Sequence, residues 1–212
     1  MMFLKYLWPD GVQKNLCAQA PKMYLPGGIN EFREEGKTKV NTSCLASLGK
    51  EWESNPQMVA FKAFCEQVVR GCAQIIVNKT MHLPYCPTIE DVIRSFTPIC
   101  EKSEKESKDD PTKMIQYSPA IKLAVNTSPT NRSMFVSQVM SADGPIFIRV
   151  PHDKVEKGGT IIPMVNFQWM YRKKLNNPAK WSFSMHASIY QAVVGGASAV
   201  GSGMSSRLVV VV

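Results

Sequence analysis

The sequence has no long hydrophobic run, and none of its apolar stretches approaches the roughly 20 residues that a membrane-spanning helix needs. It also shows no secretory leader with a cleavage site, so we expect a protein that is not secreted and works in the cytoplasm or in a virion. Leucine is scarce while valine, isoleucine and methionine are common, which favours strands in part of the chain. Hydrophobic residues still make up 44% of the 212 residues, enough to build a core.

Motifs for catalysis and cofactor binding are missing too. No serine lies in a Gly-x-Ser-x-Gly motif, and the glycine-rich run at 195–203 matches neither a dinucleotide-binding nor a P-loop pattern. The carboxylates occur in polar or helix-capping contexts rather than in pairs suited to acid–base chemistry. We therefore predict a protein that is not an enzyme, with no catalytic residues and no cofactor. A catalytic site formed only in the folded chain is the enzymatic alternative.

The six cysteines lack the close pairs that are typical of structural zinc sites. There is no Cys-x-x-Cys, and nine residues separate Cys72 from His82, which Cys86 follows. We therefore predict no metal site. Cys65 and Cys72 lie on the apolar side of an expected helix, where a cysteine acts as a small hydrophobic residue.

Acidic residues are scarce only in the second half of the chain. Residues 1–112 carry 14 basic and 14 acidic residues, a net charge of 0, whereas residues 113–212 carry 11 basic and 3 acidic residues, a net charge of +8. Such an asymmetry is typical of proteins that bind nucleic acid, phosphate or an anionic membrane surface. The alternative interpretation is that the excess positive charge serves only to keep the protein soluble and binds no acidic partner.

Helical periodicity is confined to residues 1–100, which we interpret as a mixed to helical part. Apolar residues recur at helical spacing over 56–78, and Ser54 or Asn55 can cap this helix. A second, shorter helix is expected to begin near Thr88, because acidic residues follow that capping residue. Residues 101–113 contain no apolar side chain, which predicts a charged linker or loop.

Strand periodicity dominates the last part, residues 114–212. Apolar and polar residues alternate over 165–171 and again over 181–189, which predicts a long β-hairpin. Further strands are expected at 121–125, 134–140, 146–150 and 208–212. We therefore predict a single α+β domain, in which the N-terminal part packs on a basic antiparallel sheet, sandwich or partial barrel.

The predicted hairpin brings cations and aromatic rings together. Lysine and arginine contact phosphates, and aromatic rings stack on bases, so this combination favours a nucleic acid. The same combination suits an anionic membrane surface. The predicted binding residues are Arg172, Lys173, Lys174 and Lys180 at the tip, Trp169 and Tyr171 beside it, and Lys154 and Lys157 in another turn.

A small, basic, β-rich chain without catalytic motifs is typical of structural proteins that assemble. We therefore expect a viral coat or matrix-type protein that binds itself as a homo-oligomer and also binds RNA, another nucleic acid or an anionic membrane. This expectation is an analogy of type and not of family. The alternative is a nucleic-acid-binding module that does not assemble.

We predict that reversing the charge of Arg172, Lys173 and Lys174 weakens binding to the acidic partner without unfolding the protein, because exposed cations supply phosphate contacts. A salt titration that compares RNA with anionic liposomes measures this effect. Unchanged binding at moderate salt would eliminate the hairpin tip as the contact site.

Overall fold

The computed structural model describes residues 2–3, 5–7, 11–33, 35–36, 38, 40–81, 87–106, 112–141, 144–173 and 182–195. The side chains of residues 2–3, 5–7, 103, 105–106, 169 and 171–173 lie outside this description. Within it the chain forms two α-helices and a strand-rich sheet, so the protein is an α+β protein that is mostly β.

The strands occur in both halves of the chain. They are β1 (Met2–Phe3), β2 (Lys5–Leu7), β3 (Gln13–Gln19), β4 (Met23–Tyr24), β5 (Ile29–Arg33), β6 (Val40–Ser47), β7 (Cys100–Glu106), β8 (Met114–Val125), β9 (Met134–Ser141), β10 (Gly144–Val150), β11 (Thr160–Lys173) and β12 (Ser182–Gly195). The helices are α1 (Pro56–Thr80) and α2 (Ile89–Ser95). The strands predicted at 121–125, 134–140 and 146–150 are confirmed as β8, β9 and β10, whereas the strand predicted at 208–212 lies outside the described residues.

Five strands close into a barrel. Around the ring β4 pairs with β6, β6 with β8, β8 with β12, β12 with β11, and β11 with β4. Numbered by their order along the chain, the ring reads 1-2-3-5-4 and returns to 1. We had predicted an antiparallel sheet, and this prediction is wrong in part, because β12 runs parallel to both β8 and β9.

The strands β3, β4 and β5 act as one long, interrupted first strand. β3 pairs with β11, β4 pairs with both β11 and β6, and β5 pairs with β6. The second interruption ends at Gly28, whose φ is +67°, and a Cβ there would lie 3.3 Å from the backbone of Lys157. Only glycine fits this turn without strain. The turn lets the chain pass from the edge of β11 to the edge of β6.

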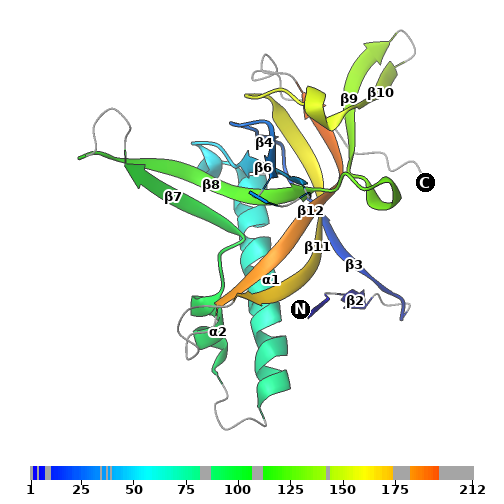
Figure 1. Ribbon diagram of the computed structural model, residues 1–212. Coiled ribbons are helices and arrows are strands. Elements are labelled where there is room, and N and C mark those ends of the chain that lie inside the picture. The colour runs from blue at the N-terminus through cyan, green and yellow to red at the C-terminus, as the bar shows by residue number, and fades with distance from the viewer. Residues whose placement is uncertain are drawn as a thin grey trace.

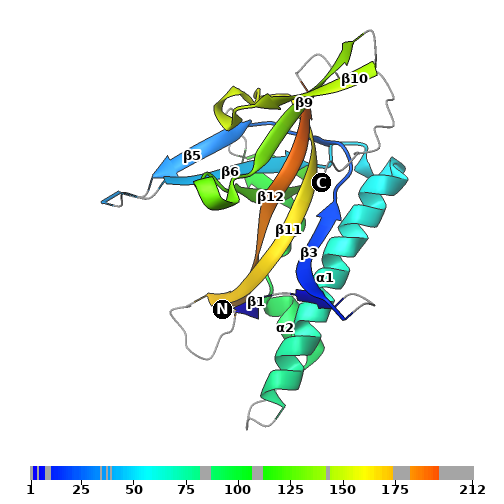
Figure 2. The ribbon, with the colours of Figure 1, turned by 90° about the vertical axis from the view of Figure 1, so that its right-hand side faces the viewer.

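Several hairpins extend from the barrel, as Figures 1 and 2 show for β7–β8, β9–β10 and β5–β6. The β11–β12 hairpin predicted from alternation is confirmed, with pairs from Thr160 and Gly195 to Lys173 and Ser182. The predicted charged linker 101–113 needs a correction, because residues 101–106 belong to β7 and pair with β8. These residues extend beyond the barrel, so the sequence carries no apolar alternation to mark the strand.

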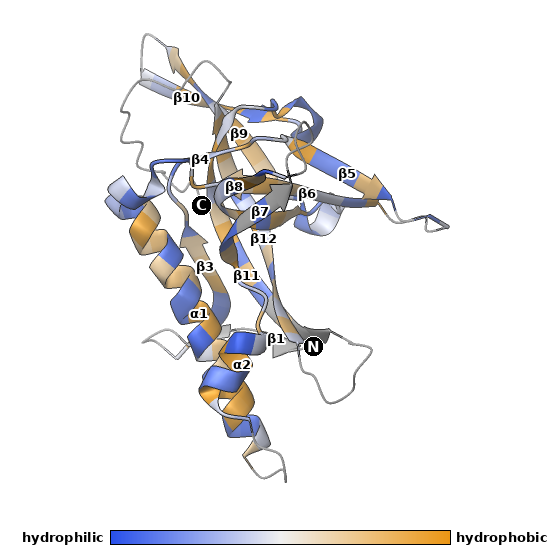
Figure 3. Ribbon diagram, turned by 90° about the vertical axis from the view of Figure 1, so that its left-hand side faces the viewer, coloured by the Kyte–Doolittle hydropathy of each residue, from blue (hydrophilic) through white to orange (hydrophobic). Residues whose placement is uncertain are grey.

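The helix α1 packs its apolar side against the barrel. Asn55 caps it by accepting hydrogen bonds from the backbone N–H groups of Gln57 and Met58, in agreement with the predicted start. Phe64 lies edge-on to Phe167, with 5.7 Å between ring centroids. Figure 3 shows the alternating apolar and polar sides of this helix. No helix in the described part of the chain is both long enough and apolar enough to cross a membrane.

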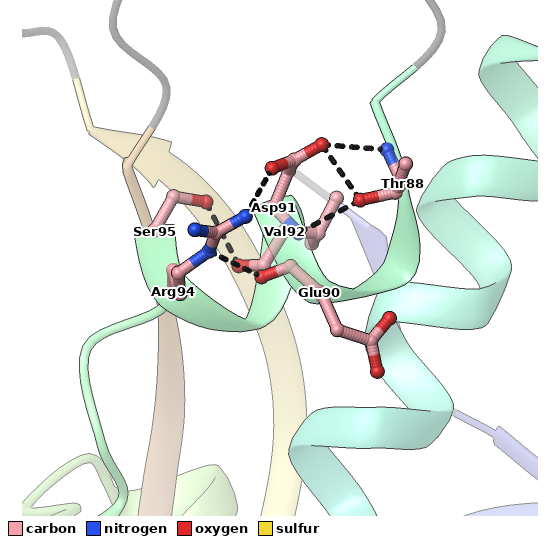
Figure 4. Close-up of polar contacts among 6 residues, drawn as sticks. All are labelled: Thr88, Glu90, Asp91, Val92, Arg94 and Ser95. Carbon is pink, nitrogen blue, oxygen red and sulfur yellow. Dashed lines mark hydrogen bonds and ion pairs between the residues drawn. The ribbon is translucent and has the colours of Figure 1, made fainter.

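The helix α2 begins with a capping box, shown in Figure 4. The Thr88 hydroxyl accepts from the backbone N–H of Asp91 at 3.1 Å, and the Asp91 carboxylate accepts from the backbone N–H of Thr88 at 3.1 Å. Hydrogen bonds from Thr88, together with Arg94, hold the pKa of Asp91 below its usual value. The helix end is tied to β12, because the Phe96 ring stacks on Phe183 with centroids 6.1 Å apart.

We predict that Phe167→Ala destabilises the protein by about 3–5 kcal/mol, because it leaves a cavity where α1 meets the barrel. Phe167 is 0% exposed. Urea unfolding followed by fluorescence measures the change in free energy. The matched control is Phe32→Ala, since Phe32 is 62% exposed and its loss should change stability by less than about 0.5 kcal/mol. Equal effects of the two substitutions would contradict this description of the core.

Candidate functional site

The alternation of buried and exposed side chains along β6 shows which residues lie on the outer surface of the barrel. Cys44 and Ala46 are buried, whereas Leu45 is 46% exposed. Because successive side chains of a strand point to opposite faces, Asn41, Ser43, Leu45 and Ser47 share the outer face. Residues paired across strands project from the same side, so the partners of these four residues lie beside them.

Two aromatic rings and one cation lie on this outer face. Phe32 of β5 pairs with Asn41, Lys122 of β8 pairs with Leu45, and Tyr24 of β4 pairs with Ser47. Phe32 is 62% exposed, Tyr24 is 41% exposed and Lys122 is also exposed. We call Tyr24, Phe32, Leu45 and Lys122 the aromatic face. The six residue steps from Asn41 to Ser47 give it a length of roughly 20 Å.

Small and polar side chains fill the spaces between these four residues. Asn30 and Ala124 flank Ser43, and Ala120 flanks Ser47. Small neighbours leave room beside the two exposed rings. The arrangement can therefore stack planar groups on Tyr24 and Phe32 and bind an anionic group at Lys122, across β6 from the rings.

The predicted lysines of the β10–β11 connection lie close to this face. Lys154 and Lys157 are exposed and make no ion pair with any described residue. Their connection packs on the turn between β4 and β5, because the backbone N–H of Gly158 donates to the carbonyl of Leu25 at 2.8 Å. Two of the predicted site residues are thus brought next to the strands that carry Tyr24 and Phe32.

The other predicted site residues are only partly placed. Trp169, Tyr171, Arg172 and Lys173 belong to β11, but their side chains are outside the described part of the structure. Lys174 and Lys180 lie outside the described residues altogether. In Figures 2 and 3 the β5–β6 hairpin and the Lys173 end of β11 extend on the side of the barrel away from α1.

The ion pairs of the described residues involve mainly the first half of the chain. Among the described residues, acidic residues of the first half pair with Lys62, Arg70, Arg94, Lys102 and His152. Four of these five residues also belong to the first half. Lys122, Arg132 and Arg149 make no ion pair with any described residue. These three side chains can therefore meet an external anion.

Four of the described cysteines are buried side chains. Burial raises the pKa of Cys44, Cys65 and Cys72 to about 12 and that of Cys100 to about 11. No group of three potential ligands could hold a metal ion in the described part of the chain. His82 and Cys86, whose spacing from Cys72 was considered for a zinc site, lie outside it.

Comparisons with known proteins do not indicate a function for this chain. No protein-family model matches the chain, and no curated protein matches it. The function therefore has to be inferred from the barrel and from the residues on its surface.

The thiols provide a test of the burial pattern. We predict that a thiol reagent such as iodoacetamide modifies Cys17, which is exposed, well before the four buried cysteines, because only a thiolate reacts. Mass spectrometry of the labelled peptides measures the order, and labelling after urea unfolding is the control. Rapid modification of Cys44 in the folded protein would contradict the packing inside the barrel.

Proposed function

We propose that the protein binds single-stranded nucleic acid across the aromatic face. The observation that carries the proposal is an exposed Tyr24 and an exposed Phe32 along one edge of β6, with Lys122 across β6 from them on the same outer face. Aromatic rings stack on unpaired bases and a lysine contacts the backbone phosphates. In a duplex the base faces are already stacked, so the geometry favours single strands.

The strand order of the barrel supports this proposal. A closed ring ordered 1-2-3-5-4 with parallel third and fifth strands is similar to the OB-fold, a Greek-key barrel. Barrels of that kind bind oligonucleotides or oligosaccharides on strands two and three and on the 1–2 and 4–5 connections. Here those strands are β6 and β8. This is a fold-level analogy, and it adds to the argument from the residues.

The basic hairpin predicted from the sequence corresponds to one of the binding connections of such barrels. The connection between the fourth and fifth ring strands is the β11–β12 hairpin, which carries Arg172, Lys173, Lys174 and Lys180. The β5–β6 hairpin lies in the connection between the first and second ring strands. Cations on these connections would hold the backbone while the aromatic face stacks the bases. An uncharged oligosaccharide would gain no electrostatic attraction from the net charge of +8.

The predicted role as a coat or matrix-type protein remains a prediction. The predicted binding to an anionic membrane surface also remains a prediction. Assembly predicts oligomers whose size grows with concentration, which light scattering measures. Membrane binding predicts flotation with anionic liposomes and none with neutral ones. Each of these measurements is independent of the single-strand proposal.

The test uses a fluorescent single-stranded oligonucleotide of about 16 nucleotides, the upper end of the site size for such barrels. We predict that Tyr24→Ala and Phe32→Ala each weaken binding by about 5- to 150-fold, because each removes one stacked base worth about 1–3 kcal/mol. Phe147→Ala is the matched control, since Phe147 is 41% exposed on β10, away from the aromatic face. Fluorescence anisotropy measures the affinities.

The salt dependence tests the role of Lys122. Lys122→Ala should reduce the slope of log affinity against log salt by about 0.7, the value for one phosphate contact on a single strand. Lys79→Ala on α1 is the control and should leave the slope unchanged. Equal affinity for duplex and single strand, or no effect of the two aromatic substitutions, would overturn the proposal.

A further inference from the structure

The β9–β10 hairpin exposes apolar side chains that the nucleic-acid proposal does not use. Val139 pairs with Ile146 on one side of the hairpin, and Ile148 follows on the same side. Val139 is 45% exposed, Ile146 is 51% exposed and Ile148 is 53% exposed. An exposed apolar cluster of this kind on a protein surface marks an interaction site.

The apolar side of the hairpin leads into a cleft at its base. Val150 and its partner Phe135 continue the row of Ile146 and Ile148 and line the cleft, which has a volume of about 440 Å³. Pro151 completes its apolar lining. An apolar strip therefore runs from the exposed hairpin to a concave site.

Basic residues form part of the lining of this cleft. Arg132, Arg149 and His152 line it. The two arginines make no ion pair with any described residue, whereas His152 lies 3.3 Å from the Glu31 carboxylate. A guanidinium group binds a carboxylate through two parallel hydrogen bonds. Asp153, the acidic residue in the lining, lowers the net charge without occupying either arginine.

No described strand pairs with the outer edge of β10. In the described part of the sheet β10 pairs only with β9 and forms one end of the strand order. A strand at a sheet edge presents backbone N–H and C=O groups that can pair with an added strand. Apolar side chains, an arginine-lined cleft and a free edge thus occur together.

We propose that β10 and this cleft bind an extended, acidic segment of another protein that adds as a strand to the sheet. Alternating apolar residues of the segment cover Ile146 and Ile148, and its carboxylates pair with Arg132 and Arg149. A second copy of this chain is a poorer occupant, because it carries the same arginines and a net charge of +8. A nucleic acid is also poorer, since the exposed row of Val139, Ile146 and Ile148 is aliphatic and the ring that lines the cleft, Phe135, is 1% exposed.

The two binding surfaces are compatible with each other. In Figures 1 and 2 the β9–β10 hairpin extends from one end of the barrel, while the β11–β12 strands run to the opposite end. A nucleic acid on the aromatic face would leave β10 accessible. The protein would then bring an acidic partner to the nucleic acid that it holds.

The experiment uses the full chain and a fluorescent seven-residue peptide, the length of β10, that alternates glutamate and valine. Anisotropy should show saturable binding, weakened roughly tenfold by the double substitution Arg132→Glu and Arg149→Glu, because two charge-assisted contacts are lost. Ile148→Asp should weaken it as well. Lys79→Glu on α1 is the matched charge reversal and should have no effect, and thermal unfolding confirms that each variant folds.

Two further peptides separate charge from strand addition. A lysine–valine peptide should not bind, and a glutamate–valine peptide with N-methylated backbone should bind weakly, because it cannot pair with the β10 edge. Equal binding of the lysine peptide, no saturable binding of the acidic peptide, or no effect of the arginine reversals would overturn the proposal. A concentration-dependent dimer that Ile148→Asp abolishes would identify a second copy as the occupant, and would overturn it too.

Oligonucleotide binding by the same variants keeps the two proposals distinct. The arginine reversals should leave affinity for the single strand nearly unchanged, and Tyr24→Ala with Phe32→Ala should leave peptide binding unchanged. If the arginine reversals weaken only oligonucleotide binding, the cleft belongs to the nucleic-acid path and the peptide proposal fails.

Discussion

The pairing of β12 with both β8 and β11 is the constraint on which the rest of the structure depends. One edge of β12 meets β8 and β9 in parallel, while the other meets β11 in antiparallel orientation. These contacts close the ring, so the buried faces of β6, β8 and β11 point to one interior. Closure also removes the free edges that these strands would otherwise expose.

The closed ring fixes which side chains face solvent. With Ile121 and Leu123 buried inside, Lys122 has to point outwards, and the same alternation places Tyr24 and Phe32 on that side. Irregular pairing along β11 and β12, such as the shift between Met164 and Val165, bends both strands around the barrel. The aromatic face is thus a consequence of packing inside the barrel as much as of the residues on its surface.

Local signals in the sequence predicted the elements that local interactions decide. The helix α1 was predicted because Asn55 and the apolar spacing lie within a few residues of it, and the β11–β12 hairpin followed from alternation on both sides of a turn. Barrel closure was not predicted, because β4 has two residues and meets β6 through a single pair, Tyr24 and Ser47. The parallel pairing of β8 with β12 joins residues far apart in the chain and leaves no local pattern.

Some residues of the candidate site could be predicted from the sequence, and others could be found only from the structure. The basic tip was visible as a run of cations, whereas Tyr24 and Phe32 became candidates only once the register of β4, β5 and β6 showed that they share a face. Exposure of an aromatic ring is a property of the assembled sheet. No composition or spacing rule for the segment 23–33 reveals it.

The central place of β12 has a consequence during synthesis on the ribosome. Until residues 182–195 have emerged, the edges of β8 and β11 that β12 covers have no partner. A nascent chain at that point presents two unsatisfied strand edges with apolar side chains on one face, which is a state prone to aggregate or to recruit chaperones. Chains cut short before Ser182 should be cleared by proteases rather than accumulate as a partly working product.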